Sequence, residues 1–224
     1  MMCAKRRIAL YGGTFDPVHL GHLEIARKVL DLFEIEKVLF VPAQIAPHKL
    51  GKAVTAPMHR YAMLVLATQE DPRLVVSTFE LESPDRRYTV DTLSYFVRTL
   101  GNGSELFFIM GADSWAEITT WREWQRLLTM VNHIIVTRPG YDVAGPVELD
   151  DRIVDLRTGR EAVVADEPGT PKIYLTDVVM KDVSATQIRS LANAGRYEEL
   201  SRLVSPTVAK YIEKYGIYRE SHEV

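Results

Sequence analysis

Short apolar runs alternate with longer amphipathic segments along most of this 224-residue chain, and this alternation constrains the fold more than any other feature. The runs have the length and composition of buried strands, and the longer segments have the 3.6-residue period of helices. We predict strands at 6–11, 36–41, 74–77, 106–110, 133–136 and 173–175, and helices at 20–33, 58–69, 89–100 and 114–128. Such alternation predicts a doubly wound α/β fold, with a mostly parallel sheet and helices on both of its faces.

The ends of four predicted strands carry the residues of most interest. Gly12, Pro42, Gly111 and Thr137 each follow a strand, so they are expected on one edge of the sheet, where doubly wound folds bind ligands. A composition of 46% hydrophobic and 25% charged residues is that of an ordinary globular chain. We therefore expect residues 1–224 to form one domain. The segment from Tyr141 to Lys172 has no pattern that can be assigned.

Composition excludes several classes of protein. A formal net charge of −3 and a pI near 6.1 argue against a nucleic-acid-coating protein. Cys3 is the one cysteine, so neither an internal disulfide nor a zinc cluster can be built from cysteines. The apolar runs are too short to span a membrane, and Lys5-Arg6-Arg7 precedes only a brief one. We expect a soluble cytoplasmic protein without membrane or nucleic-acid partners. The sequence does not predict its oligomeric state.

Familiar catalytic motifs are absent from the sequence. It contains no G-x-x-x-x-G-K-[ST], so it gives no support to a P-loop NTPase. It contains no G-x-G-x-x-G and no G-x-S-x-G, so neither a dinucleotide-dependent dehydrogenase nor a serine hydrolase of that type is supported.

The segment from Gly12 to His22 has the outline of a phosphate site. It reads as strand, glycine turn and helix, and a helix start offers free N–H groups and a positive dipole end to an anion. His19 and His22 are three residues apart, so on a helix they would share one face, roughly 4.5 Å apart along the axis. Taken alone, a tight turn followed by two ordinary polar histidines explains the same residues.

Two motifs resemble those of the nucleotidylyltransferase superfamily, which implies a Rossmann-like fold. His19-Leu20-Gly21-His22 matches its (T/H)xGH signature, whose histidines contact nucleotide phosphates. The segment 183–190 resembles its ISSTxIR element, with Val183 and Ala185 in place of isoleucine and the second serine. Ser184 can cap a helix and Arg189 can offer a planar fork of donors, although a capped surface helix is the alternative.

Further segments narrow the resemblance to the bacterial nicotinate mononucleotide adenylyltransferases. Pro47-His48-Lys49 lies in the long loop between Pro42 and Pro57, which could otherwise be a mobile loop with solvated charges. The remaining matches run nearly to the end of the chain, at Arg87-Tyr88-Thr89-Val90-Asp91-Thr92-Leu93, Gly111-Ala112-Asp113-Ser114, Trp121-Arg122-Glu123-Trp124, Arg138-Pro139-Gly140, 208–212 and 215–218.

The resemblance implies transfer of the adenylyl group of ATP to nicotinate mononucleotide, with Mg²⁺ bound mainly through the ATP phosphates and no metal ligands from the protein. It implies a C-terminal helical part, about 184–218, packed on the sheet. The implied catalytic residues are His19, His22 and Arg189. The implied ATP-binding residues are Gly12, Gly13, Thr14, Phe15, Gly21, Gly111, Asp113, Ser184 and Thr186. The implied mononucleotide-binding residues are His48, Lys49, Thr89, Trp121 and Arg122.

Several of these residues have a structural alternative. Thr89 begins a predicted helix and can receive a carboxylate, and Trp121 can stack on a pyridinium ring, while Trp124 then belongs to the core. Asp113 can accept ribose hydroxyls or simply cap a helix. Asp16, before a proline, is interpreted as a turn former.

Two other functions stay open. One is a sister enzyme, such as a phosphopantetheine adenylyltransferase or a cytidylyltransferase, which would share the histidines. It has no reason to carry His48, Thr89 and Trp121 together. The other is a non-catalytic nucleotide-binding regulator, although a sensor need not keep His19, His22 and Arg189. The sequence does not decide how strictly nicotinate is preferred over nicotinamide.

Overall fold

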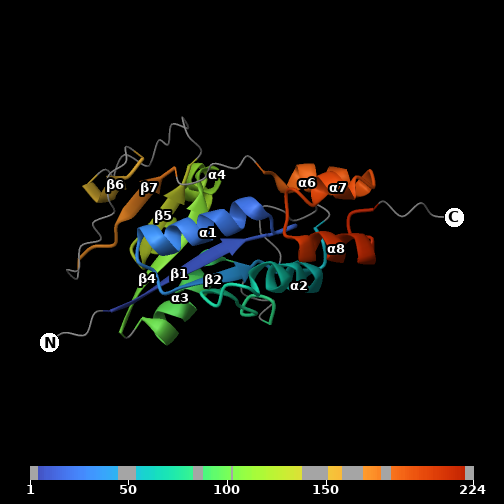
Figure 1. The fold of residues 1–224 in the computed structure, drawn as a ribbon. Helices are drawn as coiled ribbons and strands as arrows, with labels where there is room; N and C mark the ends of the chain where they lie inside the picture. Colours follow the sequence, from blue (N-terminus) through green and yellow to red (C-terminus); the bar gives the residue numbers. More distant parts are fainter. Residues whose placement is uncertain are drawn as a thin grey trace.

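The computed structural model describes residues 5–44, 54–82, 88–101, 103–137, 151–157, 169–177 and 183–219. Within them, seven strands form one sheet in the order β3-β2-β1-β4-β5-β7-β6, and all neighbouring strands are parallel (Figure 1). The strands are β1 Arg6–Gly13, β2 Lys37–Pro42, β3 Leu74–Val76, β4 Ser104–Gly111, β5 Asn132–Val136, β6 Ile153–Asp155 and β7 Ile173–Thr176. The predicted doubly wound α/β fold is confirmed.

Helices lie between the successive strands from β1 to β5, and three more follow β7. They are α1 Leu20–Leu32, α2 Pro57–Thr68, α3 Thr89–Leu100, α4 Ala112–Ala116, the 3₁₀ helix η2 Ile118–Thr120, α5 Trp124–Leu127, α6 Ala185–Asn193, α7 Tyr197–Leu200 and α8 Pro206–Tyr215. The helical region predicted at 114–128 is helical but not continuous. Trp121 is extended, with ψ 146°, and Glu123 is left-handed, with φ 51°, so the chain breaks into three short helices there. Strand β6, in the segment without a pattern, was not predicted.

The sheet separates two hydrophobic cores. Side chains alternate across a strand, so Ala9 and Tyr11 of β1 face one core while Ile8 and Leu10 face the other. Helices α1, α2, α6, α7 and α8 contribute to the first core, and α3, α4, η2 and α5 contribute to the second. Figure 1 shows the C-terminal helices α6 to α8 beyond the tip of β1, near α2.

The strand order reverses between β1 and β4. From β1 the chain continues outward through β2 and β3, then returns to place β4 on the other side of β1. In such sheets the crevice at the carboxyl ends of the two central strands binds ligands. Here those ends are Gly13 and Gly111, so the topology directs a ligand to the glycine segments singled out in the sequence.

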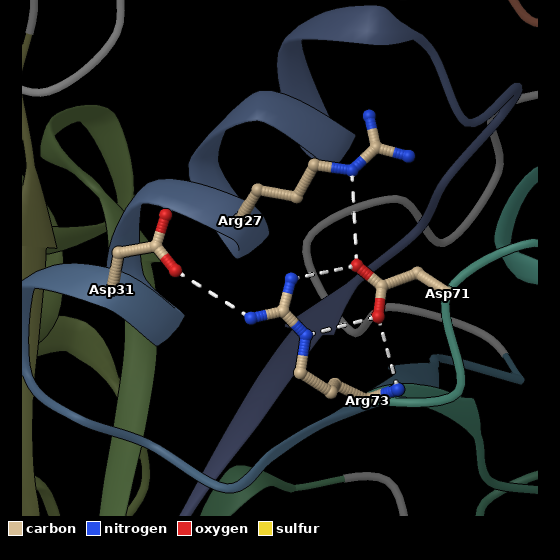
Figure 2. A network of polar contacts seen from close by, with 4 residues as sticks. All are labelled: Arg27, Asp31, Asp71 and Arg73. Carbon is tan, nitrogen blue, oxygen red and sulfur yellow. Dashed lines mark hydrogen bonds and ion pairs between the residues drawn. The ribbon is translucent and has the colours of Figure 1, made fainter.

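A polar network joins α1 to the turn before β3 (Figure 2). Arg73 binds Asp71 through its guanidinium, at 3.1 and 3.0 Å, and through its backbone N–H. It also reaches Asp31 of α1 at 3.5 Å, while Arg27 lies 4.0 Å from Asp71. The network lies at the beginning of β3, at the opposite edge of the sheet from the glycine segments, and Arg27 and Asp31 join it from the exposed surface of α1.

The described helices are short compared with the thickness of a bilayer, or are not apolar enough for it. None of them is long and apolar enough to cross a membrane.

Candidate active site

The loop from β1 to α1 turns tightly around one aromatic ring. A Cβ added to Gly13 would lie 2.8 Å from the Phe15 ring, closer than real Cβ contacts come. Phe15 has a left-handed backbone, with φ 49°, and is buried at 3% exposure. Gly13 is therefore required by packing, and the loop backbone stays open to a ligand.

The two histidines stack at the beginning of α1. Their ring centroids are 3.7 Å apart and their planes are inclined by 27°. His19 is the N-cap of α1, with extended backbone, and its N–H donates to Nδ1 of His22 at 3.2 Å. Because Nδ1 of His22 accepts a hydrogen bond, the ring proton lies on Nε2, which can donate to a ligand. The sequence prediction that the two histidines lie together is confirmed.

Burial keeps both imidazoles uncharged. It lowers the pKa of His19 to about 4, and, with the neighbouring His19 adding to the effect, it also lowers the pKa of His22 well below its usual range. Phe15 and Tyr11 pack edge-on against the His22 ring, with centroids 5.1 and 6.1 Å away. At neutral pH the free site therefore offers neutral N–H donors to a phosphate.

Arg189 of α6 joins this loop from the other end of the chain. Its Nη1 donates to the carbonyl of Asp16 at 2.7 Å, across 173 residues, and its Nη2 donates to the Thr186 hydroxyl at 3.1 Å. The N-terminal and C-terminal motifs thus lie side by side. Ser184 is the N-cap of α6, since its hydroxyl accepts from the N–H of Gln187 at 3.2 Å.

One expectation about α1 needs correction. The sequence suggested that its first N–H groups are free to face an anion, but the N–H of Leu20 donates to the carbonyl of Leu203 at 2.9 Å. The turn before α8 covers the beginning of α1 and satisfies this donor. Fewer backbone donors remain for a ligand than a helix start normally offers.

A cavity of about 370 Å³ opens at the carboxyl edge of the sheet. Gly12, Gly13 and Thr14 of the β1 loop line it, and Gly111 and Ser114 line it from the end of β4. Its other lining residues are Leu10, Val41, Ala43, Glu80, Tyr88, Thr89, Thr92, Phe108, Met110, Glu117, Thr120, Trp121, Arg122 and Leu127. Residues from the phosphate motif and from the predicted acceptor motifs therefore share one cavity.

The N-terminus of α3 is open to this cavity. Tyr88 is its N-cap and makes no side-chain capping bond. The N–H groups of Asp91 and Thr92 bond to the carbonyl of Tyr88, whereas no described group accepts from those of Thr89 and Val90. Two backbone donors and the positive end of a 12-residue helix are thus available to an anion.

Aromatic and cationic side chains also line the cavity. Trp121 lines the cavity, whereas Trp124 packs on the same core without being part of the lining. The guanidinium of Arg122 lies 4.8 Å from the centre of the Tyr88 ring, so these two lining side chains are in cation–π contact. Trp121 is placed where it can contact a bound ring.

Other predicted residues lie elsewhere. Asp113 is exposed in the first turn of α4 and does not line the cavity. Gly21 is buried within α1. His48 and Lys49 lie outside the described residues. Their ligand-binding roles remain predictions.

Comparison with known proteins gives the family. The sequence pattern of the cytidylyltransferase-like family matches residues 10–191. A probable nicotinate-nucleotide adenylyltransferase of Thermoanaerobacter sp. (strain X514) is 38% identical over 217 residues, which cover 97% of this chain and 96% of that protein. A protein of the same name from Desulfitobacterium hafniense (strain Y51) is 40% identical over 215 residues, 96% of each chain. The chain belongs to the nicotinate-nucleotide adenylyltransferase family.

Membership of the adenylyltransferase family confirms the predicted resemblance, and it makes the chain an enzyme, a nucleotidyltransferase. A solved nicotinic acid mononucleotide adenylyltransferase of Plasmodium falciparum, complexed with NaAD, has the same fold. Its TM-score is 0.71 at 21% identity, and the match covers 95% of this chain and 97% of that one. The predicted fold class is thereby also found in a solved structure.

Arg60 is a residue of this adenylyltransferase that the sequence did not single out. It is fully buried in α2, and its guanidinium donates to the carbonyls of Thr14, Gln44 and Thr55 at 2.7, 2.9 and 2.9 Å. Thr14 belongs to the glycine loop, and Gln44 and Thr55 flank the segment that contains His48 and Lys49. An arginine in a helical pattern gives no signal of such a role.

Asp16 has more contacts than a turn former needs. Its carboxylate accepts from the Tyr218 hydroxyl at 2.8 Å and from the Thr55 N–H at 3.2 Å. Burial, reinforced by the Asp16 charge, raises the pKa of Tyr218, so the phenol stays protonated. Asp16 thus ties the C-terminal segment to the adenylyltransferase site.

Among the residues that the structure describes, no group of three or more His, Cys, Asp or Glu side chains could hold a metal ion.

Proposed function

We propose that this site joins nicotinate mononucleotide to ATP, forming nicotinate adenine dinucleotide and releasing pyrophosphate, a step of NAD biosynthesis. The observation that carries the proposal is the shared cavity, lined both by Gly12 to Thr14 and by Thr89 and Trp121. A phosphate motif alone would suit any nucleotidyltransferase. The second set of residues supplies donors and an aromatic ring for an acidic pyridine.

The acceptor is recognised by charge and stacking. Its carboxylate would accept from the free N–H groups at the beginning of α3, and its ring would stack on Trp121. Arg122 would close the cavity over it. His48 and Lys49, which lie outside the described residues, would bind the acceptor's phosphate.

The reaction needs positioning more than proton transfer. The 5′-phosphate of the acceptor has a second pKa near 6, so at pH 7 it is largely a dianion and needs no base. Its oxygen attacks the α-phosphorus of ATP, the new P–O bond forms and the bond to pyrophosphate breaks. His19 and His22 would donate to the phosphate oxygens, and Arg189 would stabilise the leaving pyrophosphate.

The nucleotide is held mostly by backbone. We propose that ATP contacts Gly12, Gly13, Thr14, Phe15, Gly21, Gly111, Asp113, Ser184 and Thr186. Since the described residues contain no carboxylate cluster that could hold Mg²⁺, the ATP phosphates would hold it, and there it would reduce the charge on them. We also propose that residues 1–224 act as one domain in the cytoplasm, where ATP is present.

Pyrophosphate release from ATP tests this function directly. We expect release with nicotinate mononucleotide, much less with nicotinamide mononucleotide and none with phosphopantetheine. Release with phosphopantetheine but with neither mononucleotide would identify a sister enzyme. Binding of ATP without any release would identify a regulator.

A further inference from the structure

Glu80 lies in the cavity beside the N-terminus of α3, and the proposed mechanism does not use it. The Thr92 hydroxyl donates to Oε1 of Glu80 at 2.6 Å, and both residues line the cavity. Thr92 is three residues beyond Thr89 on the same helix face, roughly 4.5 Å along the axis. The Glu80 carboxyl is therefore about one helical turn from the donors proposed for the acceptor's carboxylate.

The other groups around Glu80 do not fix its charge. Arg60 of α2 attracts it, but the Arg60 guanidinium is bonded to three carbonyls, and no ion pair joins it to Glu80. Tyr88, Glu117 and Arg122 line the same cavity. Among the described residues, only Thr92 donates to the Glu80 carboxyl.

Burial makes the charge of Glu80 sensitive to pH near neutrality. It raises the pKa of Glu80 to about 7, while the Thr92 hydrogen bond and the Arg60 charge act in the opposite direction. Two carboxylates this close in a partly dry cavity cannot both ionise without repulsion. The neutral form of Glu80 removes that repulsion, and its O–H becomes a donor.

We propose that Glu80 is a specificity-determining residue of the acceptor pocket, which binds the acceptor's carboxylate together with one proton held on Glu80. This inference rests on the proposed function. The proton comes from solvent and resides on Oε2, while Oε1 keeps its bond to Thr92. An acceptor with an amide in place of the carboxylate needs no such proton.

The test is the pH dependence of KM for two acceptors between pH 6.5 and 8.5. In the wild type, KM for nicotinate mononucleotide rises by up to about 25-fold, because binding coupled to one proton weakens up to tenfold per pH unit above the pKa and the range extends about 1.5 units above it. KM for nicotinamide mononucleotide stays flat. Both acceptors carry the same 5′-phosphate, so its own titration affects them equally.

Three variants separate this role from a structural one. Glu80→Gln mimics the neutral carboxyl, so its KM for nicotinate mononucleotide no longer rises with pH. Thr92→Val removes the hydrogen bond that favours the ionised form, so the rise moves to higher pH. Glu82→Gln removes an exposed charge two residues away and should leave the wild-type profile unchanged.

The outcomes are distinct. A profile for Glu80→Gln that rises as steeply as the wild type overturns the inference. If that variant does not fold, an unmoved profile in Thr92→Val overturns it instead. No pyrophosphate from the wild type with either acceptor contradicts the proposed function, whereas turnover with a flat wild-type profile contradicts only the role of Glu80.

Discussion

Burial sets the protonation of single residues in this site before any substrate arrives. The backbone N–H of His19 occupies Nδ1 of His22, so the proton lies on Nε2 without help from a ligand. Because both imidazoles are neutral, the site loses little by desolvating them. Their contribution is a fixed pair of donors.

His22→Ala removes one of these donors. We expect kcat to fall roughly 10²- to 10³-fold, the usual effect of losing a donor to developing charge, while the melting temperature changes by only a few degrees. His59→Ala is the matched control, because His59 bonds Tyr211 on the α2–α8 side and should keep normal kcat. Wild-type turnover in a folded His22→Ala protein would contradict the assignment.

Trp121→Ala tests the proposed stacking of Trp121 on the ring of the acceptor. We expect KM for nicotinate mononucleotide to rise about tenfold or more, since an aromatic stack on a cation contributes roughly 1–2 kcal/mol, and KM for ATP to stay within about twofold. Trp124→Ala removes a tryptophan that is not part of the lining and should mainly lower stability. Equal effects of Trp121→Ala on both substrates would count against stacking.

For single residues, the sequence predicted which residues belong to the site better than it predicted what they contact. Trp121, which the resemblance favoured over Trp124 for the ligand, lines the cavity, while its stacking on the ligand stays a prediction. Arg60 and Glu80 were missed. Their roles depend on which carbonyls and hydroxyls surround them, and these come from segments far away in sequence.

At the scale of elements, two helices begin with the same device. Ser184 caps α6 and Ser205 caps α8, each accepting from the N–H three residues on, at 3.2 and 3.4 Å. Of these two helices, only α6 carries a proposed catalytic residue, Arg189. Comparing Ser184 with Ser205 therefore separates the stability that an N-cap contributes from its effect on the site.

Ser184→Ala and Ser205→Ala should each cost about 1 kcal/mol of unfolding free energy, the usual value of an N-cap. We expect kcat to fall several-fold in Ser184→Ala alone, because fraying of α6 loosens Arg189. Urea denaturation and steady-state kinetics check the two effects. Equal kcat values in both variants would show that Ser184 is only a cap.

The network of Figure 2 predicts a pH dependence at the α1–β3 junction. The Arg73 guanidinium lowers the pKa of Asp71. Its stabilisation is therefore complete above the unfolded pKa of about 3.9 and is lost as the pH falls below that value.

Asp71→Asn should lower the unfolding free energy at pH 7 by up to about 1 kcal/mol, since the pair is partly screened by solvent. The difference from wild type should shrink below about pH 4, as followed by urea denaturation. Asp31→Asn removes an exposed partner and should have no measurable effect. A difference that persists unchanged at low pH would contradict the ionic origin.

Element boundaries were predictable where one period continued without interruption. The 3.6-residue pattern of α3 gave its observed bounds, Thr89–Leu100. Over 114–128 the same reasoning predicted a helical region but not its breaks, because the left-handed Glu123 interrupts a pattern that still looks helical. Strand β6 was missed because its three residues are defined only by pairing with β7.

At the scale of the whole molecule, the site is an assembly of distant segments. Arg189 and Asp16 meet across 173 residues, and Tyr218 reaches Asp16 from near the C-terminus. Arg60 joins three further backbone segments through hydrogen bonds to their carbonyls. These contacts make the C-terminal helices part of the site.

Arg60→Met should destabilise the protein by about 3–5 kcal/mol, because three carbonyls lose a buried charged donor. We also expect a higher KM for nicotinate mononucleotide, since the ends of the segment with His48 and Lys49 are held at Gln44 and Thr55. Arg27→Met, on the exposed face of α1, is the control. A loss of less than about 1 kcal/mol in the free energy of unfolding would contradict this role of the three Arg60 hydrogen bonds.

The sequence by itself determined the fold class, the family and the residues of the phosphate motifs, because hydrophobic period and local motifs are properties of neighbouring residues. The tertiary structure decided which of those residues share a cavity, which donors are already occupied and which acids and bases are neutral. Burial and long-range hydrogen bonds set these properties, and both exist only once segments as distant as Asp16 and Arg189 have come together.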